Sequence, residues 1–183
     1  MERRLKTRLL LLTPLIGFGI LVFFLGIGFR IGKHTVHPSA LLNDPFPEFS
    51  SMTLLDEKRI TRDDLIGTFR LVNVWASWCT ACIEEHDLLL DLARSETISI
   101  IGINYRDNAE DAKTWLYERG NPYEKVVVDE QGDVCIDLGV YGAPETFLVD
   151  PKGIIRAKQV GVLTRTVWME EFQPWLETKG AQN

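Results

Sequence analysis

Cysteine is scarce in this sequence: Cys79, Cys82 and Cys135 are the only three among 183 residues. Three cysteines are too few for a fold that depends on a framework of disulfides. Two of them stand three positions apart. This spacing suits a structural disulfide, half of a metal site or a redox-active dithiol, so the rest of the chain must distinguish the three.

Further metal ligands are also few. A zinc site needs four ligands, and the sequence offers only Cys135, His34, His37 and His86 beside the cysteine pair. We interpret His34 and His37 as solvated residues of a polar linker and His86 as a surface or packing residue. We therefore expect no metal and no other cofactor. A purely structural bridge is also disfavoured, because so short a loop constrains the unfolded chain little.

Positive charge is depleted outside the N-terminus. The first 33 residues hold six basic groups and one acidic group, which leaves 14 basic and 25 acidic groups, a net charge of −11, for residues 34–183. A domain this acidic, without a basic patch, argues against nucleic-acid binding and favours a protein partner or a small solute. The hydrophobic content of 45% is enough for one folded domain.

Only one stretch is long and apolar enough to cross a membrane. Residues 9–29 are 21 consecutive uncharged residues, which span roughly 31 Å as a helix and match the hydrocarbon core of a bilayer. A cleaved signal peptide is the alternative. It is disfavoured because the run is longer than a usual signal sequence and the nearest cleavage-like site, at residues 38–40, lies too far downstream.

The charges on either side of this run predict its orientation. Four basic residues precede it and two follow it: Arg3, Arg4, Lys6 and Arg8, then Arg30 and Lys33. The excess favours a cytoplasmic N-terminus and an exported C-terminal domain. We therefore expect a basic cytoplasmic segment at 1–8, a transmembrane anchor at 9–29, a linker at 30–45 and a folded domain at 46–183.

Within the domain, apolar patterning predicts alternating strands and helices. The predicted strands are 69–76, 97–105 and 124–129, followed by a hairpin of 145–150 and 154–161 around the turn 151–153. The predicted helices are 81–95, 107–120, a short one within 130–139, and 165–179 with Pro174 as a weak point. This order indicates an α/β fold with a mixed sheet and helices on both faces.

The cysteine pair lies where a buried strand passes into a helix. Cys79 is expected at the helix N-terminus, where free N–H groups and the helix dipole stabilise a thiolate, and it would be the exposed, attacking sulfur. Cys82 follows by one turn, with its Cα about 5 Å from that of Cys79, within disulfide range. It could resolve a mixed disulfide.

Two further motifs bring the chain to a known family. "LVNVWASWCTACIEEH" at 71–86 is followed by "GVYGAPETFLVD" at 139–150, and "PSALLNDPFPEF" at 38–49 precedes both. The strand, CxxC, helix and late proline loop resemble the thioredoxin superfamily. More narrowly, residues 38–177 resemble the DsbE (CcmG) family of membrane-anchored proteins of cytochrome c maturation.

The resemblance implies a thioredoxin-like fold and a specific activity. The protein would be held in the inner membrane, face the periplasm and reduce a disulfide in apocytochrome c so that haem can be attached. Its electrons would come from a transmembrane thiol reductant, and its partners would include other cytochrome c maturation proteins. No cofactor beyond the cysteine pair is implied.

The resemblance also assigns roles to individual residues. It implies that Cys79 is the nucleophile and Cys82 the resolving thiol, and that Pro144 is a cis-proline beside Ala143, whose backbone would pair with a substrate strand. Acidic site residues are implied at Glu85 and Glu145. Read without the resemblance, Glu85 is a solvated helix residue and Glu145 a charge at the edge of a strand.

Two positions depart from the expected patterns. Thr80 and Ala81 stand between the cysteines, where the family commonly has Pro-Thr, and this difference bears on the reduction potential. Asn73 stands where thioredoxin has a buried aspartate that helps to move protons. Because an amide cannot act as a base at neutral pH, Glu85 is the nearest candidate for that task.

Alternatives to the leading function are a general periplasmic reductase or oxidase with another client, and a non-catalytic chaperone for haem or for assembly. Cys135, between apolar neighbours, is expected to be a small buried residue and not a regulatory thiol. Four aromatic residues are expected on the core faces of helices: Trp115, Trp168, Phe172 and Trp175.

Overall fold

The computed structural model describes residues 17–23 and 41–177. Residues 17–23 are helical, but within the described residues no helix is long and apolar enough to cross a membrane. Most of the predicted anchor, residues 9–16 and 24–29, lies outside the described part of the chain. The chain divides into two compact units, residues 1–37 and 38–183, and the second contains the folded domain.

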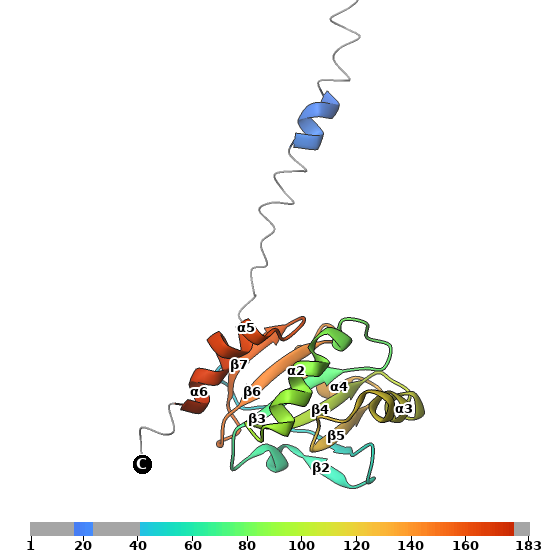
Figure 1. The fold of residues 1–183 in the computed structure, drawn as a ribbon, viewed down its shortest axis with the longest axis vertical. Helices are drawn as coiled ribbons and strands as arrows, with labels where there is room; N and C mark the ends of the chain where they lie inside the picture. The colour runs from blue at the N-terminus through green and yellow to red at the C-terminus, as the bar shows by residue number, and fades with distance from the viewer. Residues whose placement is uncertain (1–16, 24–40, 178–183) are drawn as a thin grey trace, which may run out of the picture. The chain divides into compact units, whose positions relative to one another are not determined.

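A five-stranded mixed sheet forms the centre of the domain (Figure 1). The strands run in the order β5-β4-β3-β6-β7. Their bounds are β3 Arg70–Trp75, β4 Ser99–Tyr105, β5 Lys125–Asp129, β6 Glu145–Val149 and β7 Ile155–Val160. The first three are parallel, and β6 and β7 are antiparallel to their neighbours. The predicted α/β class and hairpin are confirmed.

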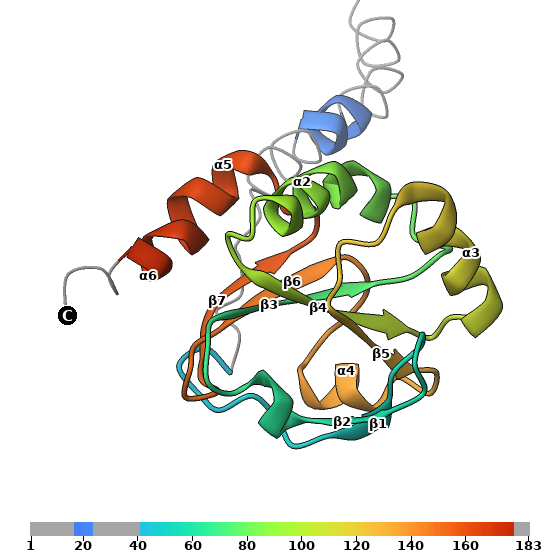
Figure 2. The same ribbon diagram turned by 60° about the horizontal axis from the view of Figure 1, so that its bottom comes forward.

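Helices cover both faces of this sheet. Figure 2 shows α2 (Cys82–Arg94) and α3 (Ala109–Arg119) on one side and α4 (Asp133–Asp137) on the other. Leu89 of α2 and Trp115 of α3 belong to one buried cluster, whereas Val134 of α4 belongs to a second. Each helix thus buries its apolar stripe against one face of the strands.

The ends of α3 are defined by its flanking residues. Asn108 precedes the helix, and its side chain accepts hydrogen bonds from the N–H groups of Glu110 and Asp111. Gly120 ends the helix with a φ of 90°, which glycine adopts without steric cost. The helix predicted for residues 107–120 is therefore confirmed, with its caps inside the predicted range.

Residues 46–68, to which the sequence analysis assigned no element, form a small subdomain. It contains β1 (Ser50–Met52), β2 (Arg59–Thr61) and a 3₁₀ helix, η1 (Arg62–Leu65). Thr53 bridges to Val127 of β5, so this subdomain covers that edge of the sheet. Upstream, the N–H of Asn43 donates to the carbonyl of Ile155 at 2.8 Å, so the end of the predicted linker is already paired with β7.

The C-terminal helical segment is continuous but changes type. It comprises α5 (Arg165–Val167), the π-helix η2 (Trp168–Phe172) and α6 (Gln173–Glu177). The π-helix ends just before Pro174, which lacks the N–H needed to continue a regular ladder. Trp168 and Phe172 are buried as predicted, whereas Trp175 is 38% exposed, so its assignment to the core was wrong.

Candidate active site

Cys79 and Cys82 form a disulfide where β3 leads into α2. Their Cα atoms are 5.4 Å apart, close to the expected distance. The helix begins at Cys82 and not at Cys79. The N–H of Cys82 nevertheless points at the Cys79 sulfur, with an N···Sγ distance of 3.1 Å. The Cys79 sulfur therefore accepts a hydrogen bond from an N–H of the first helical turn, as its position just before the helix predicts.

The disulfide is more buried than expected. Cys79 is only 4% exposed and Cys82 2%, so the expectation of an exposed sulfur at Cys79 was wrong for this oxidised form. The neighbouring Trp78 is 54% exposed and Thr80 is also exposed. The residues on either side of Cys79 in the sequence are thus exposed, whereas Cys79 itself is buried.

Asp107, in the loop between β4 and α3, holds the segment that leads to Cys79. Its carboxylate accepts hydrogen bonds from the N–H of Ser77 at 2.5 Å and from the Ser77 hydroxyl at 2.7 Å. One residue earlier in that loop, the carbonyl of Arg106 accepts a hydrogen bond from Nε1 of Trp78. These contacts fix the backbone just before the first cysteine.

Glu85 lies one turn after Cys82 on the buried side of α2. It is 1% exposed, so the solvated-helix interpretation was wrong. Its Oε1 accepts from Nδ2 of Asn73 at 2.7 Å, and its Oε2 accepts from the N–H of Leu163 at 2.6 Å. Burial raises the pKa of this carboxyl from 4.5 to about 7, although both hydrogen bonds favour the ionised form.

Asn73 is the centre of a buried polar network. Its Nδ2 also donates to Thr146 Oγ1 at 3.0 Å, and its Oδ1 accepts from the Tyr123 hydroxyl at 2.9 Å. The amide thus uses both donor hydrogens and its oxygen. Tyr123 is buried, and this burial, followed by the nearby Glu85 carboxyl, raises its pKa well above the usual value, so its hydroxyl keeps the proton. The network orients Glu85. At the position where thioredoxin has a buried aspartate, Asn73 provides a hydrogen-bond donor to the Glu85 carboxylate.

Aromatic rings surround this network. Trp75 stacks on Tyr123 with ring centroids 5.4 Å apart and packs against Trp115 at 5.0 Å. His86 meets Trp115 edge-on at 4.5 Å, which confirms its expected packing role. Gly102 allows this arrangement, because a Cβ there would stand 2.8 Å from Nε1 of Trp75.

The proline loop, residues 139–144, precedes β6. The Ala143–Pro144 peptide bond is cis, as the resemblance implies. Glu145, the first residue of β6, pairs with Val74 near the C-terminal end of β3. The loop therefore lies at the same end of the sheet as the segment that leads from β3 to Cys79. Within residues 41–177, no hydrogen bond engages the backbone of Ala143. Tyr141 of the same loop is 94% exposed.

Glu145 lies on the face of the sheet opposite Glu85. Side chains alternate along β6, so Thr146 faces Asn73 and α2, whereas Glu145 and Phe147 face α4. Glu145 is 1% exposed; it accepts from the N–H of Tyr141 at 3.0 Å and pairs with Lys158 at 2.8 Å. The solvated strand-edge interpretation was wrong, and a catalytic role for this residue stays a prediction.

Cys135 is separated from the disulfide by the sheet. It is fully buried in the cluster that contains α4, as predicted, and burial raises its pKa strongly. In the described part of the chain, no group of three or more histidine, cysteine or acidic residues is placed to hold a metal ion. His34 and His37 lie outside the described residues.

The arrangement is suited to dithiol–disulfide exchange. It combines a disulfide at a helix start, a buried carboxyl with a pKa about 7 one turn further on, and an exposed aromatic surface. Sequence reasoning did not identify Tyr123, Thr146, Asp107 or Lys158 as contributors. A signal existed for Thr146, because strand alternation places it on the same face as Asn73 once the two strands are paired.

Comparisons with known proteins agree with this site. Residues 41–172 match the Redoxin family. The thiol:disulfide interchange protein DsbE of Pseudomonas fluorescens biotype C is 44% identical over 165 residues, which cover 90% of this chain and 92% of the relative. The DsbE of Allochromatium vinosum is 45% identical over 164 residues, or 89% of this chain and 90% of the relative.

The solved structures support the same fold. The solution structure of a putative thioredoxin from Neisseria meningitidis is 23% identical, covers 74% of this chain and 92% of its own, and has a TM-score of 0.64. At that identity the likeness concerns the fold alone. The CxxC disulfide, the Redoxin match and the curated relatives show that this chain is a protein-disulfide oxidoreductase that belongs to the DsbE family of thiol:disulfide interchange proteins.

Proposed function

We propose that this oxidoreductase is anchored in the inner membrane and reduces the disulfide of apocytochrome c in the periplasm before haem is attached. The observation that carries the disulfide-exchange role is the carboxyl of Glu85, buried one turn from Cys82 with a pKa about 7. A group that exchanges its proton near neutral pH can accept the proton of a resolving thiol.

The reaction begins from the reduced form, with Cys79 as thiolate. The Cys79 sulfur attacks the substrate disulfide, so a Cys79–substrate disulfide forms and one substrate thiolate leaves. Cys82 then gives its proton to ionised Glu85 and attacks Cys79, which forms the Cys79–Cys82 bond and releases the second substrate thiolate. Two electrons pass from the protein to the substrate, and a transmembrane thiol reductant restores the dithiol.

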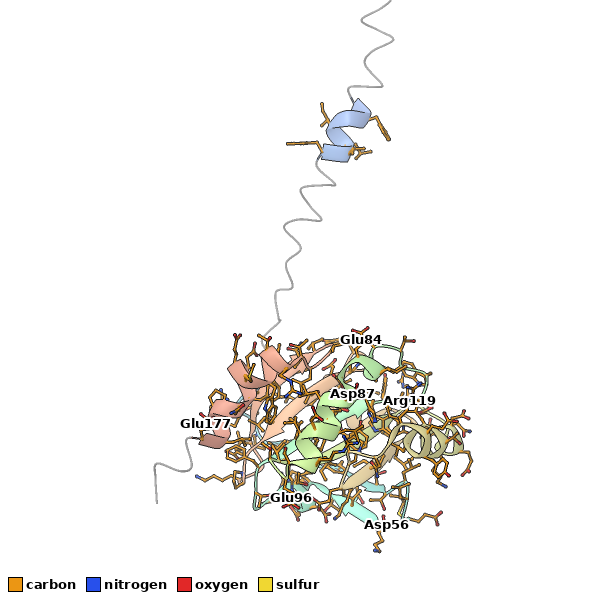
Figure 3. All side chains as sticks on the ribbon, viewed as in Figure 1. Asp56, Glu84, Asp87, Glu96, Arg119 and Glu177 are labelled. Carbon is orange, nitrogen blue, oxygen red and sulfur yellow. A yellow bond between two sulfur atoms is a disulfide. The ribbon has the colours of Figure 1, made fainter. Side chains whose placement is uncertain are left out.

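The surface near the cysteines supports a polypeptide substrate. Trp78 and Tyr141 are exposed aromatic residues close to the CxxC segment and in the proline loop. The unpaired backbone of Ala143 offers a donor and an acceptor to an extended chain. Figure 3 shows acidic side chains such as Glu84 and Asp87 on α2, in keeping with a net charge that argues against nucleic acid.

A trapping experiment tests the client. In the full chain, Cys82→Ser should leave Cys79 in a stable mixed disulfide, and mass spectrometry of the captured protein should identify apocytochrome c. The matched control is Cys79→Ser with Cys82→Ser, which lacks both exchange thiols and keeps only the buried Cys135. Recovery of abundant unrelated proteins alone would contradict a dedicated client and favour a general oxidoreductase.

Three further measurements address direction, location and the chaperone alternative. A reduction potential close to the strongly oxidising end of the superfamily, about −120 mV, would contradict the reducing role. Protease added to spheroplasts should digest the C-terminal domain of the full chain, since the anchor at 9–29 is proposed to leave it outside the cytoplasm. Cytochrome c assembly that persists in the double serine variant under non-reducing conditions would favour the chaperone alternative.

A further inference from the structure

Lys158, on β7, carries an unusually buried cation. Its side chain is 8% exposed, and lysine is almost never buried to this extent unless it is paired. Its Nζ lies 2.8 Å from Oε2 of Glu145, whose side chain is 2% exposed, and 5.0 Å from the centroid of the Phe147 ring. The two charges therefore compensate each other within the face of the sheet that packs against α4.

Both members of this pair also bind the backbone of the proline loop. Nζ of Lys158 donates to the carbonyl of Gly139 at 3.2 Å. Oε1 of Glu145 accepts from the N–H of Tyr141 at 3.0 Å. The cation thus holds the first residue of the loop and the carboxylate holds the third.

The loop has few other anchors. The N–H groups of Gly139 and Val140 donate to the carbonyls of Ile136 and Cys135 at 3.0 and 2.8 Å, the carbonyl of Pro144 accepts from the N–H of Gly161 at 2.9 Å, and the Val140 side chain is buried. Tyr141 is 94% exposed, so its side chain contributes little packing. Loss of Lys158 would leave the Gly139 carbonyl without its partner and the buried Glu145 carboxylate, which accepts from the Tyr141 N–H, without its counter-charge, so the loop would be held less firmly.

We propose that Lys158 and Glu145 are a positioning pair that fixes the proline loop for docking of a polypeptide disulfide. They act on substrate alignment and not on the chemistry of the cysteines, because Glu145 faces α4 whereas Asn73 and Glu85 lie on the side of α2. A small disulfide needs no docking along the loop, so only extended substrates should sense the pair. The inference requires only the disulfide-exchange activity and holds whatever the natural client is.

The test compares two probes on the reduced full chain by stopped flow. One probe is Ellman's reagent, a small disulfide, and the other is a synthetic extended peptide with one intramolecular disulfide. We expect Lys158→Met to lower the ratio of the peptide rate to the small-disulfide rate about tenfold or more, the range found when reacting groups are misplaced. The equilibrium constant with glutathione should not change.

Matched variants separate positioning from a loss of charge or of folding. Lys152→Met removes an exposed cation from the turn at the far end of the same hairpin and should leave the ratio unchanged. Lys158→Arg keeps the cation and should restore part of the ratio. Hydrogen exchange at the Tyr141 amide should accelerate in Lys158→Met and not in Lys152→Met.

A second variant covers the case in which Lys158→Met leaves Glu145 charged and unfolds the domain. Lys158→Met with Glu145→Gln removes both charges, keeps an oxygen for the Tyr141 N–H and still lacks the bond to Gly139, so the ratio should remain low. The proposal is overturned if both rates fall in parallel, if neither falls, or if the glutathione equilibrium shifts. Failure of the double variant to fold also overturns it, since the pair would then support the whole domain.

Discussion

Replacing Glu85 with glutamine tests whether the carboxyl behind the disulfide holds its proton near neutral pH. The folded chain binds this proton more tightly than the unfolded chain, because burial raises the pKa from 4.5 to about 7. Below pH 4.5 both states are protonated, so the ionisation of Glu85 costs no stability. As the pH rises from 4.5 to about 7, only the unfolded state releases the proton, and the free energy of unfolding falls.

The size of this effect follows from the pKa change. At roughly 1.36 kcal/mol per pKa unit, the rise corresponds to a loss on the order of 3 kcal/mol, complete above about pH 7. Glutamine at this position is neutral at every pH. It keeps an oxygen for Asn73 but loses the bond to the Leu163 N–H, which costs about 1–3 kcal/mol independently of pH.

Urea unfolding of the oxidised unit Pro38–Asn183 measures the difference. Other carboxyls with lowered pKa values, such as Asp64 and Asp150, give slopes of the opposite sign in acid, but they cancel when the variant is subtracted from the parent. The difference in free energy of unfolding should move by about 3 kcal/mol in favour of the variant between about pH 4 and about pH 8. A difference that does not depend on pH would refute the raised pKa.

Four other substitutions or treatments have definite expected outcomes. Asn73→Asp places a second carboxyl 2.7 Å from Glu85, and the two carboxyls should share one proton. In urea at about pH 8 the free energy of unfolding should fall by a few kcal/mol, and an unchanged midpoint would contradict this expectation. Gly102→Ala should cost about 1–3 kcal/mol in thermal unfolding because its Cβ meets Trp75 and Tyr123. Gly142→Ala, with nothing within 4 Å of the new Cβ, should be nearly neutral. Cys135 should resist a thiol-blocking reagent in the native chain and react only in urea, since burial raises its pKa; native labelling would oppose this.

The regular part of the fold was predictable because its strands and helices have long apolar patterns. The apolar run at 69–76 and the helical spacing at 81–95 define β3 and α2 to within a residue or two at most ends. Residues 46–68 were not predicted, since β1 and β2 have only three residues each and present no period to read. The start of α2 was placed too early because the turn at Thr80 and Ala81 resembles a first helical turn in sequence.

The site was predictable where chemistry depends on spacing and not where it depends on burial. Cys79 and Cys82 were recognised from their separation. Glu85, read without the resemblance, was predicted to be solvated, because acidic side chains are usually exposed to solvent. The pattern did hold a signal, since Glu85 lies three and four positions before Leu88 and Leu89 on the buried face of α2. Lys158 gave no such signal, because its partner is set by strand pairing between β6 and β7.

The placement of Glu85 and Glu145 on opposite faces of one sheet separates two ways in which such a protein can diversify. If Lys158 and Glu145 position the proline loop as proposed, substitutions on the α4 side would act on the docking of a polypeptide, whereas substitutions around Glu85 on the α2 side would act on proton transfer at the cysteines. A full layer of hydrogen-bonded backbone stands between them. On that proposal, the docking of a polypeptide and the redox chemistry of the cysteines could change independently of each other.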